Sequence, residues 1–490
     1  PAANKSAGRH AGFAFAMSSA IGNNALWENT MNVQATDFKK LKGHIQGEVL
    51  FPGDKAYDTA RIIWNAMIDK RPAAIVRCAA TADIVDAVNF ARDHKLVLAI
   101  RGGGHNIAGS ALCDDGVVID LSSMKAAAVQ PGERRGTVEG GATLADFDAA
   151  TQEHGLATPL GINSTTGVAG LTLGGGFGWL SRKYGMTVDN LESAEVVIAS
   201  GEILQASAAR HPDLFWALRG GGGNFGVVTR FEFRLHPVGP DVLSGLMVYP
   251  IAEARRILQQ YRQFADAAPE ELSVWALLRN APPLPFLPEN VHGKPILGLA
   301  LFYAGDAKAG EPLIEPLRKF GTLLGEHVGV QPYVAWQRAF DPLLAPGARN
   351  YWKSHNLSKL EDGLFDVAIQ YAQTLPSPQC EIFFGAIGGA TMRPAPDSAA
   401  YAHRDARFIM NVHARWESQA DDARCTNWAR DFFKASAPFA TGGVYVNFLT
   451  ADEGERIHSA YGSNYERLAQ VKRRYDPGNL FRMNQNVAPV

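Results

Sequence analysis

The sequence predicts an α+β protein built in two parts, and three observations indicate this. In the first half of the chain, short apolar runs such as Ala74–Val76 alternate with amphipathic helical patterns. The same half contains three glycine-rich blocks, and this glycine-rich character ends near residues 237–240. Beyond that point, longer helical patterns alternate with strand-like runs and proline-rich loops. We therefore place the main domain boundary near residues 237–240.

Length and composition limit the class of protein. A chain of 490 residues is long enough for about two or three domains and a large core. The net charge of −2 provides no overall field that would attract nucleic acid or an anionic membrane. The sequence contains no apolar run of about 18 residues, so no membrane-spanning helix is predicted. We expect a small-molecule substrate as the partner.

The cysteines predict no metal or redox site. They are Cys78, Cys113, Cys380 and Cys425. They lie far apart, without a Cys-x-x-Cys pair and without paired histidines at ligand spacing. We expect neither a zinc site nor a redox dithiol.

The start of the chain has two interpretations. The stretch Ala11–Gly22 is rich in small apolar residues and follows Lys5 and Arg9. It is either a tail or a weak secretory segment, and we favour the tail. A cytoplasmic location is favoured accordingly, while a secreted or periplasmic one also fits.

The first regular elements form a strand, helix, strand unit. Ala74–Val76 is predicted as a strand, and Thr81 as the N-cap of a helix. The helix carries apolar residues at helical spacing: Ile84, Val85, Val88 and Ala91. A second strand, Val97–Ile100, leads directly into a glycine-rich turn.

That turn, Arg101–Gly109, reads Arg-Gly-Gly-Gly-His-Asn-Ile-Ala-Gly. Successive glycines can direct their N–H groups into one concavity, which suits an anionic pyrophosphate. One interpretation is an ordinary tight turn in which His105 is incidental. A second, the Rossmann dinucleotide loop, requires a helix directly after the glycines, whereas a further strand, Val117–Asp120, follows here. The third is a flavin turn in which His105 bonds to the methyl carbon of the flavin's benzenoid ring.

The pattern then continues to the end of the first part. It predicts, in order, a strand at Gly136–Glu139, a helix at Thr143–His154 closed by Gly155, a hairpin of Val196–Ala199 with Ile203–Leu204, a helix at His211–Leu218 and a strand at Val227–Leu235. Two more glycine-rich blocks, Gly161–Gly185 and Arg219–Gly226, lie within it. So many glycines cost conformational entropy. Either close approach of a flat ring or tight packing of helix on sheet explains them.

The second part predicts helices at Ala252–Ala267 and Gly310–Leu324 and a strand at Phe408–Trp416. On that strand Asn411, His413 and Arg415 share one face, which is either exposed to solvent or a polar pocket wall. Near the end of the chain, residues 463–466 form a potential capping box for a helix that Asp476-Pro-Gly stops.

Three separated motifs carry a family resemblance. They are Arg-Gly-Gly-Gly-His followed by Gly-Val-Val-Ile-Asp-Leu-Ser, the block at 161–185, and Arg-Gly-Gly-Gly-Gly-Asn-Phe-Gly before Val-Val-Thr. In this order they resemble the berberine bridge enzyme branch of the p-cresol methylhydroxylase and vanillyl-alcohol oxidase family. The resemblance implies an N-terminal extension (1–49), a two-part FAD-binding domain (50–240 with a C-terminal segment, 442–490) and a substrate domain with an antiparallel sheet (241–441).

The resemblance also implies the cofactor site, with FAD linked covalently to His105. Many relatives form a second link through a cysteine, but Asn163 stands at that position. His105 is therefore expected to be the only link. The other implied cofactor residues are Arg101, Gly102, Gly103, Gly104, Asn106, Gly109, Ser110, Gly161, Thr165, Thr166, Gly170, Gly174, Gly176, Gly178, Val228, Asn484 and Asn486.

For catalysis the resemblance points to Tyr445 and Asn447, which share a face if residues 443–448 form a strand. Sugar-oxidising relatives often have a second tyrosine as base, at the position where this chain has Phe448. Tyr445 would then serve, although a free phenol with a pKa of about 10 is a poor base near pH 7. We expect Lys353 nearby to lower that pKa, because related amine oxidases carry a lysine in a similar stretch.

The implied activity is oxidation of an alcohol or hemiacetal CH–OH group by hydride transfer to flavin N5. Dioxygen is the favoured electron acceptor, although Thr166 is neither the small residue of good oxidases nor the bulky residue of dehydrogenases. Leu171 also replaces a histidine found in many relatives. The alternatives are an amine, polyketide or alkaloid oxidase, a noncovalent FAD and NADPH reductase, and a flavin carrier without useful turnover.

Overall fold

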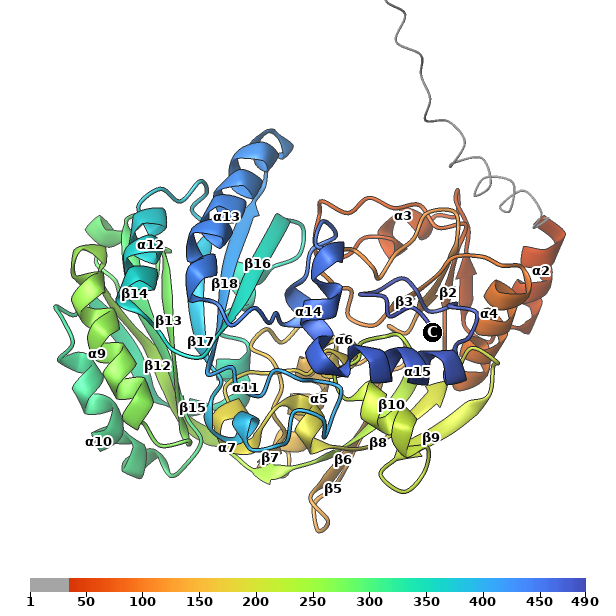
Figure 1. Cartoon of the computed structure of the whole chain (residues 1–490), viewed down its shortest axis with the longest axis horizontal. Coiled ribbons are helices and arrows are strands. Elements are labelled where there is room, and N and C mark those ends of the chain that lie inside the picture. The colour runs from red at the N-terminus through yellow and green to blue at the C-terminus, as the bar shows by residue number, and fades with distance from the viewer. Residues whose placement is uncertain (1–34) are drawn as a thin grey trace, which may run out of the picture.

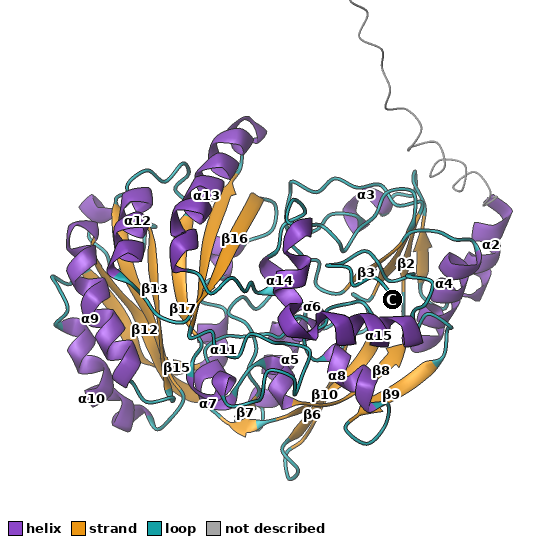
Figure 2. Ribbon diagram, viewed as in Figure 1, coloured by secondary structure: helices purple, strands orange, loops and turns teal. Residues whose placement is uncertain are grey.

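The computed structural model describes residues 35–490, so the stretch Ala11–Gly22 lies outside the described residues. Figures 1 and 2 show a large antiparallel sheet with its helices on one side and two smaller sheets on the other. The last helices of the chain, α14 (Ile457–Tyr461) and α15 (Tyr465–Tyr475), return to the side of the smaller sheets. The predicted α+β class with antiparallel sheets is confirmed.

The first small sheet holds the predicted strand, helix, strand unit. Its strand order is β1-β2-β4-β3, with β2, β4 and β3 parallel. The strands are β1 (Glu48–Leu50), β2 (Ala74–Arg77), β3 (Leu98–Arg101) and β4 (Val117–Asp120). Because β3 and β4 are parallel neighbours, the turn after β3 opens at the carboxyl edge of the sheet, where ligands bind in such folds.

The second small sheet has the order β5-β6-β10-β8-β9 and is antiparallel. The strands are β5 (Ala127–Gln130), β6 (Arg135–Glu139), β8 (Leu191–Val197), β9 (Ile203–Ser207) and β10 (Val227–Arg234). A short pair, β7 (Leu156–Ala157) with β11 (His236–Pro237), leads to the large sheet. On β10, Phe231 and Phe233 are fully buried while Arg230 and Arg234 are exposed, as the alternation predicts.

The large sheet has seven strands in the order β15-β12-β14-β13-β17-β18-β16, all antiparallel. They are β12 (Asp241–Pro250), β13 (Leu272–Asn280), β14 (Pro295–Tyr303), β15 (Gly325–Pro332), β16 (Arg349–Leu357), β17 (Glu381–Ala386) and β18 (Phe408–Trp416). Every residue of β18 is buried. Figure 2 shows α9 (Ala254–Ala267), α10 (Ala307–Arg318), α12 (Asp362–Ala372) and α13 (Asp422–Ser436) on one face of this sheet. The opposite face is free to form a wall of the cavity described below.

The remaining helices connect these sheets. They are α2 (Ala35–His44), α3 (Tyr57–Ala60), α4 (Thr81–Asp93), α5 (Leu144–Gln152), α6 (Val168–Leu173), α7 (Ser181–Tyr184), α8 (Pro212–Leu218) and α11 (Tyr333–Gln337). Thr143 caps α5 in a full capping box, because its side chain accepts from the Asp146 N–H and Asp146 accepts in return. No helix among the described residues is long and apolar enough to cross a bilayer.

Four local predictions were wrong in detail. Ala80 rather than Thr81 is the N-cap of α4, and the Thr81 hydroxyl reaches Glu195 instead. The helix predicted to extend to residue 324 ends at Arg318, because β15 begins at residue 325. Residues 463–466 form no side-chain cap, since a 3₁₀ turn leads straight into α15. Residues 446–448 form a 3₁₀ turn rather than part of a strand.

A buried ion pair holds the C-terminal segment in place. The Lys472 ammonium on α15 and the Asp476 carboxylate are both fully buried, 2.7 Å apart. Lys472 also donates to the carbonyls of Asn224 and Phe481, while Asp476 accepts the N–H groups of Leu480 and Phe481. The pair therefore holds α15 against the third glycine-rich block and against the irregular segment that follows the helix.

We predict that Lys472→Met destabilises the protein by about 3–5 kcal/mol, because it leaves the Asp476 carboxylate buried without its cation. Urea unfolding followed by tryptophan fluorescence measures the change. The matched control is Lys319→Met, which breaks an exposed pair with Glu315 at the same helical spacing and should cost less than about 1 kcal/mol. Equal losses in the two variants would contradict this account of α15.

Candidate active site

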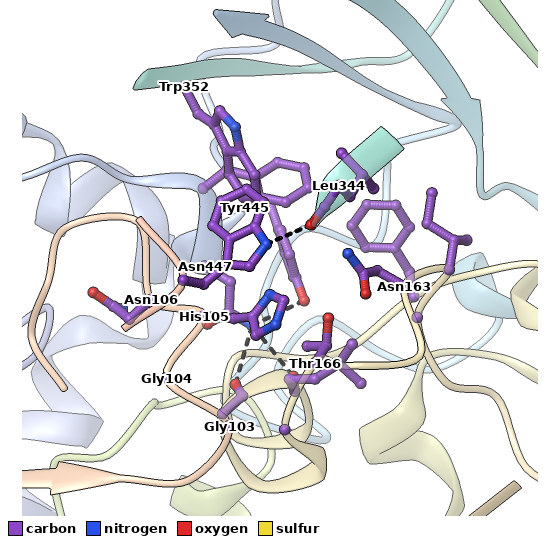
Figure 3. A pocket seen from close by; sticks show the side chains of 18 of the residues that line it. Gly103, Gly104, His105, Asn106, Asn163, Thr166, Leu344, Trp352, Tyr445 and Asn447 are labelled. Carbon is purple, nitrogen blue, oxygen red and sulfur yellow. Dashed lines mark hydrogen bonds between the residues drawn. The ribbon is translucent and has the colours of Figure 1, made fainter. Parts of the chain in front are cut away.

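A cavity of about 360 Å³ lies between the glycine-rich blocks and the free face of the large sheet. Its floor is backbone from all three blocks, including Gly103, Gly170 and Gly223. Its walls are mostly apolar side chains. Figure 3 shows His105 near the centre of the view, with Asn163 to the right and Tyr445 and Trp352 above it.

The first two glycine blocks touch each other at the floor of the cavity. A Cβ added at Gly103 would collide with the backbone of Gly167, and one added at Gly167 would collide with Gly103. The contact is therefore possible only between glycines. It places the His105 turn directly beside the loop of Asn163 and Thr165.

His105 projects into the cavity from the turn after β3. Its ring stacks on Trp64 at 5.2 Å between centroids and 20° between planes. Its Nε2 lies 3.0 Å from Thr165 Oγ1. Desolvation lowers the pKa of His105 to about 4, so the ring is neutral at physiological pH.

Tyr445 and Asn447 meet at another part of the wall. Asn447 Nδ2 donates to the Tyr445 hydroxyl oxygen at 3.0 Å, and the Gly176 N–H donates to the same oxygen at 3.1 Å. The predicted pairing of these side chains is present although their backbone is a 3₁₀ turn. Burial raises the pKa of Tyr445 to about 12, despite these two donors, so the phenol keeps its proton near pH 7.

Aromatic side chains also line the cavity, among many aliphatic ones. They are Trp64, Phe177, Trp179, Trp275, Phe340, Trp352, Phe383 and Phe448. Phe448 packs edge-on against both Tyr445 and Trp352, at 5.0 and 5.2 Å between centroids. Such a lining suits a flat apolar ligand.

One end of the cavity is polar, and its residues come from three neighbouring strands of the large sheet. Arg279 on β13 donates to Glu381 on β17 at 2.8 Å, and His413 Nδ1 on β18 lies 3.7 Å from Glu381. Burial alone would raise the pKa of Glu381, but Arg279 and His413 outweigh it and hold that pKa low. Asn411 on β18 also lines this end. Of the two interpretations of this strand, the pocket wall is therefore the right one for Asn411 and His413.

The protonation of His413 follows from its neighbours. Its Nε2 lies 3.0 Å from Asn350 Oδ1, and Asn350 is oriented by the donation of its own Nδ2 to Ala348 O. An amide oxygen only accepts, so Nε2 carries the proton. Burial lowers the pKa of His413, although Glu381 acts in the opposite sense. Nδ1 of the neutral ring therefore bears a lone pair at the polar end of the cavity.

The expectation that Lys353 lies beside Tyr445 does not match the structure. Successive residues of a strand point to opposite faces, and it is Trp352 that lines the cavity. The Lys353 ammonium lies instead 3.2 Å from Asp452 and 3.3 Å from Glu453, above the ring of Phe433 on α13. The donors to Tyr445 are Asn447 and Gly176 rather than a cation.

Most other predicted cofactor residues line the cavity. These are Gly102, Gly103, Gly104, His105, Asn106, Ser110, Gly161, Thr166, Gly170, Val228 and Asn484. Others do not line the cavity but contact residues near it. The Gly109 N–H donates to the Asn106 carbonyl, and Thr165 contacts His105. Gly174 packs against the Asn447 side chain, and Gly178 packs against the backbone of Leu160. Arg101 donates to the Ala60 carbonyl, and Asn486 Oδ1 is buried without a partner.

Several residues of the cavity wall were not predicted from the sequence. Trp64 lies in an irregular segment and is held by the Leu344 carbonyl at 2.7 Å, a contact across 280 positions of sequence. Arg279 and Glu381 sit on strands whose pairing decides their meeting. Arg279 and Glu381 could have been identified from the sequence as charged residues within otherwise apolar strand patterns.

The cavity fits a flat dinucleotide cofactor. A Cβ at Gly170 would meet no atom within 4 Å, so backbone faces open space there. Gly104 has φ +71° in this turn, a left-handed conformation that glycine-rich phosphate-binding turns use. Asn484 Oδ1 is buried without a protein partner and belongs to a cavity residue, so it can accept from a bound ligand.

Comparison with known proteins identifies the cofactor. Residues 72–207 match the model of an FAD-binding domain, and residues 444–488 match the berberine and berberine-like model. An FAD-linked oxidoreductase of Dictyostelium discoideum is 33% identical over 91% of this chain and 95% of its own length. The chain belongs to the berberine bridge enzyme-like family. It is an FAD-linked oxidoreductase with FAD as its cofactor.

Solved structures share the whole architecture. The 6-hydroxy-D-nicotine oxidase of Arthrobacter nicotinovorans superposes with a TM-score of 0.81 at 27% identity, over 91% of this chain and 98% of that one. The glucooligosaccharide oxidase of Acremonium strictum superposes with a TM-score of 0.79 at 22% identity, over 90% and 97%. At that identity the second match shows the fold alone.

Proposed function

We propose that this berberine bridge enzyme-like protein oxidises the CH–OH group of a small aromatic alcohol, with FAD covalently attached at His105. One observation carries the proposal: the neutral His105 ring and the doubly hydrogen-bonded Tyr445 line one aromatic cavity. The bound flavin supplies the hydride acceptor, N5. The protein's part is to hold the alcohol carbon and to remove the hydroxyl proton.

The attachment at His105 is supported by its neutral ring and its place in the wall. It is also supported by the glucooligosaccharide oxidase of Acremonium strictum, whose FAD is described as cysteinyl and histidyl. Asn163 lines the cavity beside this turn and carries no sulfur. We therefore propose a single link. The four cysteines are buried, and none of them is among the residues that line the cavity.

We propose separate roles for Tyr445 and His413 toward the hydroxyl group of the substrate. Tyr445 donates its hydroxyl proton in a hydrogen bond to the alcohol oxygen, because its own oxygen already accepts from Asn447 and Gly176. His413 Nδ1 takes the hydroxyl proton, and the Glu381 carboxylate 3.7 Å away stabilises the imidazolium that results. Arg279 keeps Glu381 ionised for this purpose.

Amine oxidation is the second candidate. It is favoured by the name of a relative, the (R)-6-hydroxynicotine oxidase of Paenarthrobacter nicotinovorans, which is 29% identical over 91% of this chain and 97% of its own length. A carboxylate in the cavity, Glu381, is also a suitable partner for an ammonium. Anaerobic flavin bleaching by matched benzyl alcohols and benzylamines separates the two candidates.

We predict that denatured protein keeps its flavin, visible as fluorescence on a denaturing gel, and that His105→Ala abolishes this fluorescence. The change removes the attached nitrogen, while FAD can still bind weakly. His154→Ala, in the exposed turn that follows α5, is the control and should stay fluorescent. Release of all flavin from the denatured wild-type protein into the supernatant would contradict the proposed covalent link at His105.

We predict that Tyr445→Phe slows anaerobic flavin reduction by about 10- to 100-fold, since a hydrogen bond to a group that develops charge is worth about 1.5–3 kcal/mol. The wild-type rate should be constant above about pH 6.5 and fall in acid, as protonation of His413 removes the acceptor. A rate that instead keeps rising to about pH 10 would assign the base to Tyr445. A variant rate within a few-fold of wild type removes Tyr445 from the mechanism.

We propose dioxygen as the electron acceptor, since Thr166 leaves more room at the flavin site than the bulky residue of dehydrogenases. Reduced enzyme exposed to air should recover its flavin absorbance within seconds. Thr166→Leu should slow that recovery without slowing reduction by substrate. Reduced flavin that persists for many minutes in air would make the protein a dehydrogenase.

A further inference from the structure

The two ring nitrogens of His105 have different surroundings. Nε2 lies 3.0 Å from Thr165 Oγ1. The same Oγ1 lies 2.7 Å from Asn163 Oδ1, and the Thr165 N–H donates to that Oδ1 at 3.1 Å. Three residues are thus connected in one chain, from Asn163 through Thr165 to His105.

The direction of each hydrogen bond in this chain follows from its chemistry. An amide oxygen accepts and never donates, so the Thr165 hydroxyl proton points to Asn163 Oδ1. The bond from the Thr165 N–H orients the amide the same way. Thr165 Oγ1 can then only accept a hydrogen bond from His105, so His105 Nε2 must carry the hydrogen.

A neutral imidazole holds a single N–H, and the His105 ring is neutral because desolvation lowers its pKa to about 4. With the proton on Nε2, the lone pair is on Nδ1. A ring nitrogen must have a free lone pair to attack carbon. The chain therefore selects which nitrogen is nucleophilic.

We propose that Asn163 and Thr165 are positioning residues for flavin attachment, which hold the proton on Nε2 and so leave Nδ1 free, the nitrogen named in the 8α-N1-histidyl FAD of the Acremonium strictum glucooligosaccharide oxidase. This inference rests on the proposed link at His105. It gives Asn163 a role of its own: where many relatives have a second attachment point, this chain has the acceptor that fixes the histidine tautomer.

Attachment forms one C–N bond, breaks one C–H bond and transfers two electrons. The Nδ1 lone pair forms a bond to the methyl carbon, one C–H bond of that methyl group breaks, and its proton leaves to solvent. The electron pair of the broken bond reduces the flavin by two electrons, and the alkylated imidazole then loses its Nε2 proton. Dioxygen, as the two-electron acceptor, restores the oxidised flavin.

The two positions predict different effects when changed. In Asn163→Leu the hydroxyl loses its acceptor and turns to donate to Nε2, which stabilises the wrong tautomer. In Thr165→Val no hydroxyl remains, so both tautomers are populated. Asn163→Leu should therefore impair attachment more than Thr165→Val does. Asn163→Asp and Thr165→Ser retain the acceptor and the hydroxyl and should attach flavin as wild type does.

The test measures the fraction of covalent flavin in each purified full-length protein by intact mass, with circular dichroism to compare folding. We expect wild type, Asn163→Asp and Thr165→Ser to be fully attached, Thr165→Val partly attached, and Asn163→Leu attached several-fold less. The ¹⁵N NMR spectrum of the wild-type flavin peptide should show attachment through Nδ1.

Two results would overturn the inference: a wild-type link through Nε2, or an Asn163→Leu protein as fully attached as wild type. If Asn163→Leu fails to fold, the two Thr165 variants provide the test. A lower fraction of covalent flavin in Thr165→Val than in Thr165→Ser supports the inference, and equal fractions contradict it. Wild-type protein with no covalent flavin contradicts the proposed function itself, and is thereby distinguished from failure of this inference alone.

Discussion

The backbone contact between Gly103 and Gly167 is the constraint on which the site depends. No side chain fits at either position, so only glycines let the turn after β3 and the loop before α6 approach this closely. This contact joins the first small sheet to the loops of the second and sets His105 beside Thr165. The cavity floor is therefore backbone, which lets a flat ring lie directly against it and leaves chemistry to the few side chains around the edge.

The large sheet supplies the other half of the site through strand alternation. Its helix-covered face holds the salt bridges of Lys353, while its free face holds Trp352, Asn411 and His413. The ion pair of Arg279 with Glu381 is costly to bury and is satisfied only because β13 and β17 are neighbours. The cavity thus offers aromatic and aliphatic side chains over most of its wall and a compensated charge pair at its polar end.

Local patterns predicted much of this arrangement. The strands around the first glycine block, the helix α5 and the polar residues of β18 were predicted from periodicity and turn residues, whereas the capping box of Thr143 was not. The wall formed by Trp64, Arg279 and Glu381 was not, because those residues meet through contacts between distant segments. Lys353 was misplaced for a related reason: a resemblance within a stretch does not fix which face of the strand a residue occupies, and a shift of one position reverses it.

Hydride transfer from an alcohol carbon is the central claim, and isotopic substitution tests it most directly. Aromatic alcohols carrying hydrogen or deuterium at the carbinol carbon are mixed with the oxidised enzyme without air, and bleaching of the flavin band is timed. The account predicts that a member of such a panel bleaches the flavin and that its deuterated form does so more slowly. An enzyme that no alcohol of the panel bleaches, but that NADPH bleaches rapidly, would contradict the account and would be a reductase.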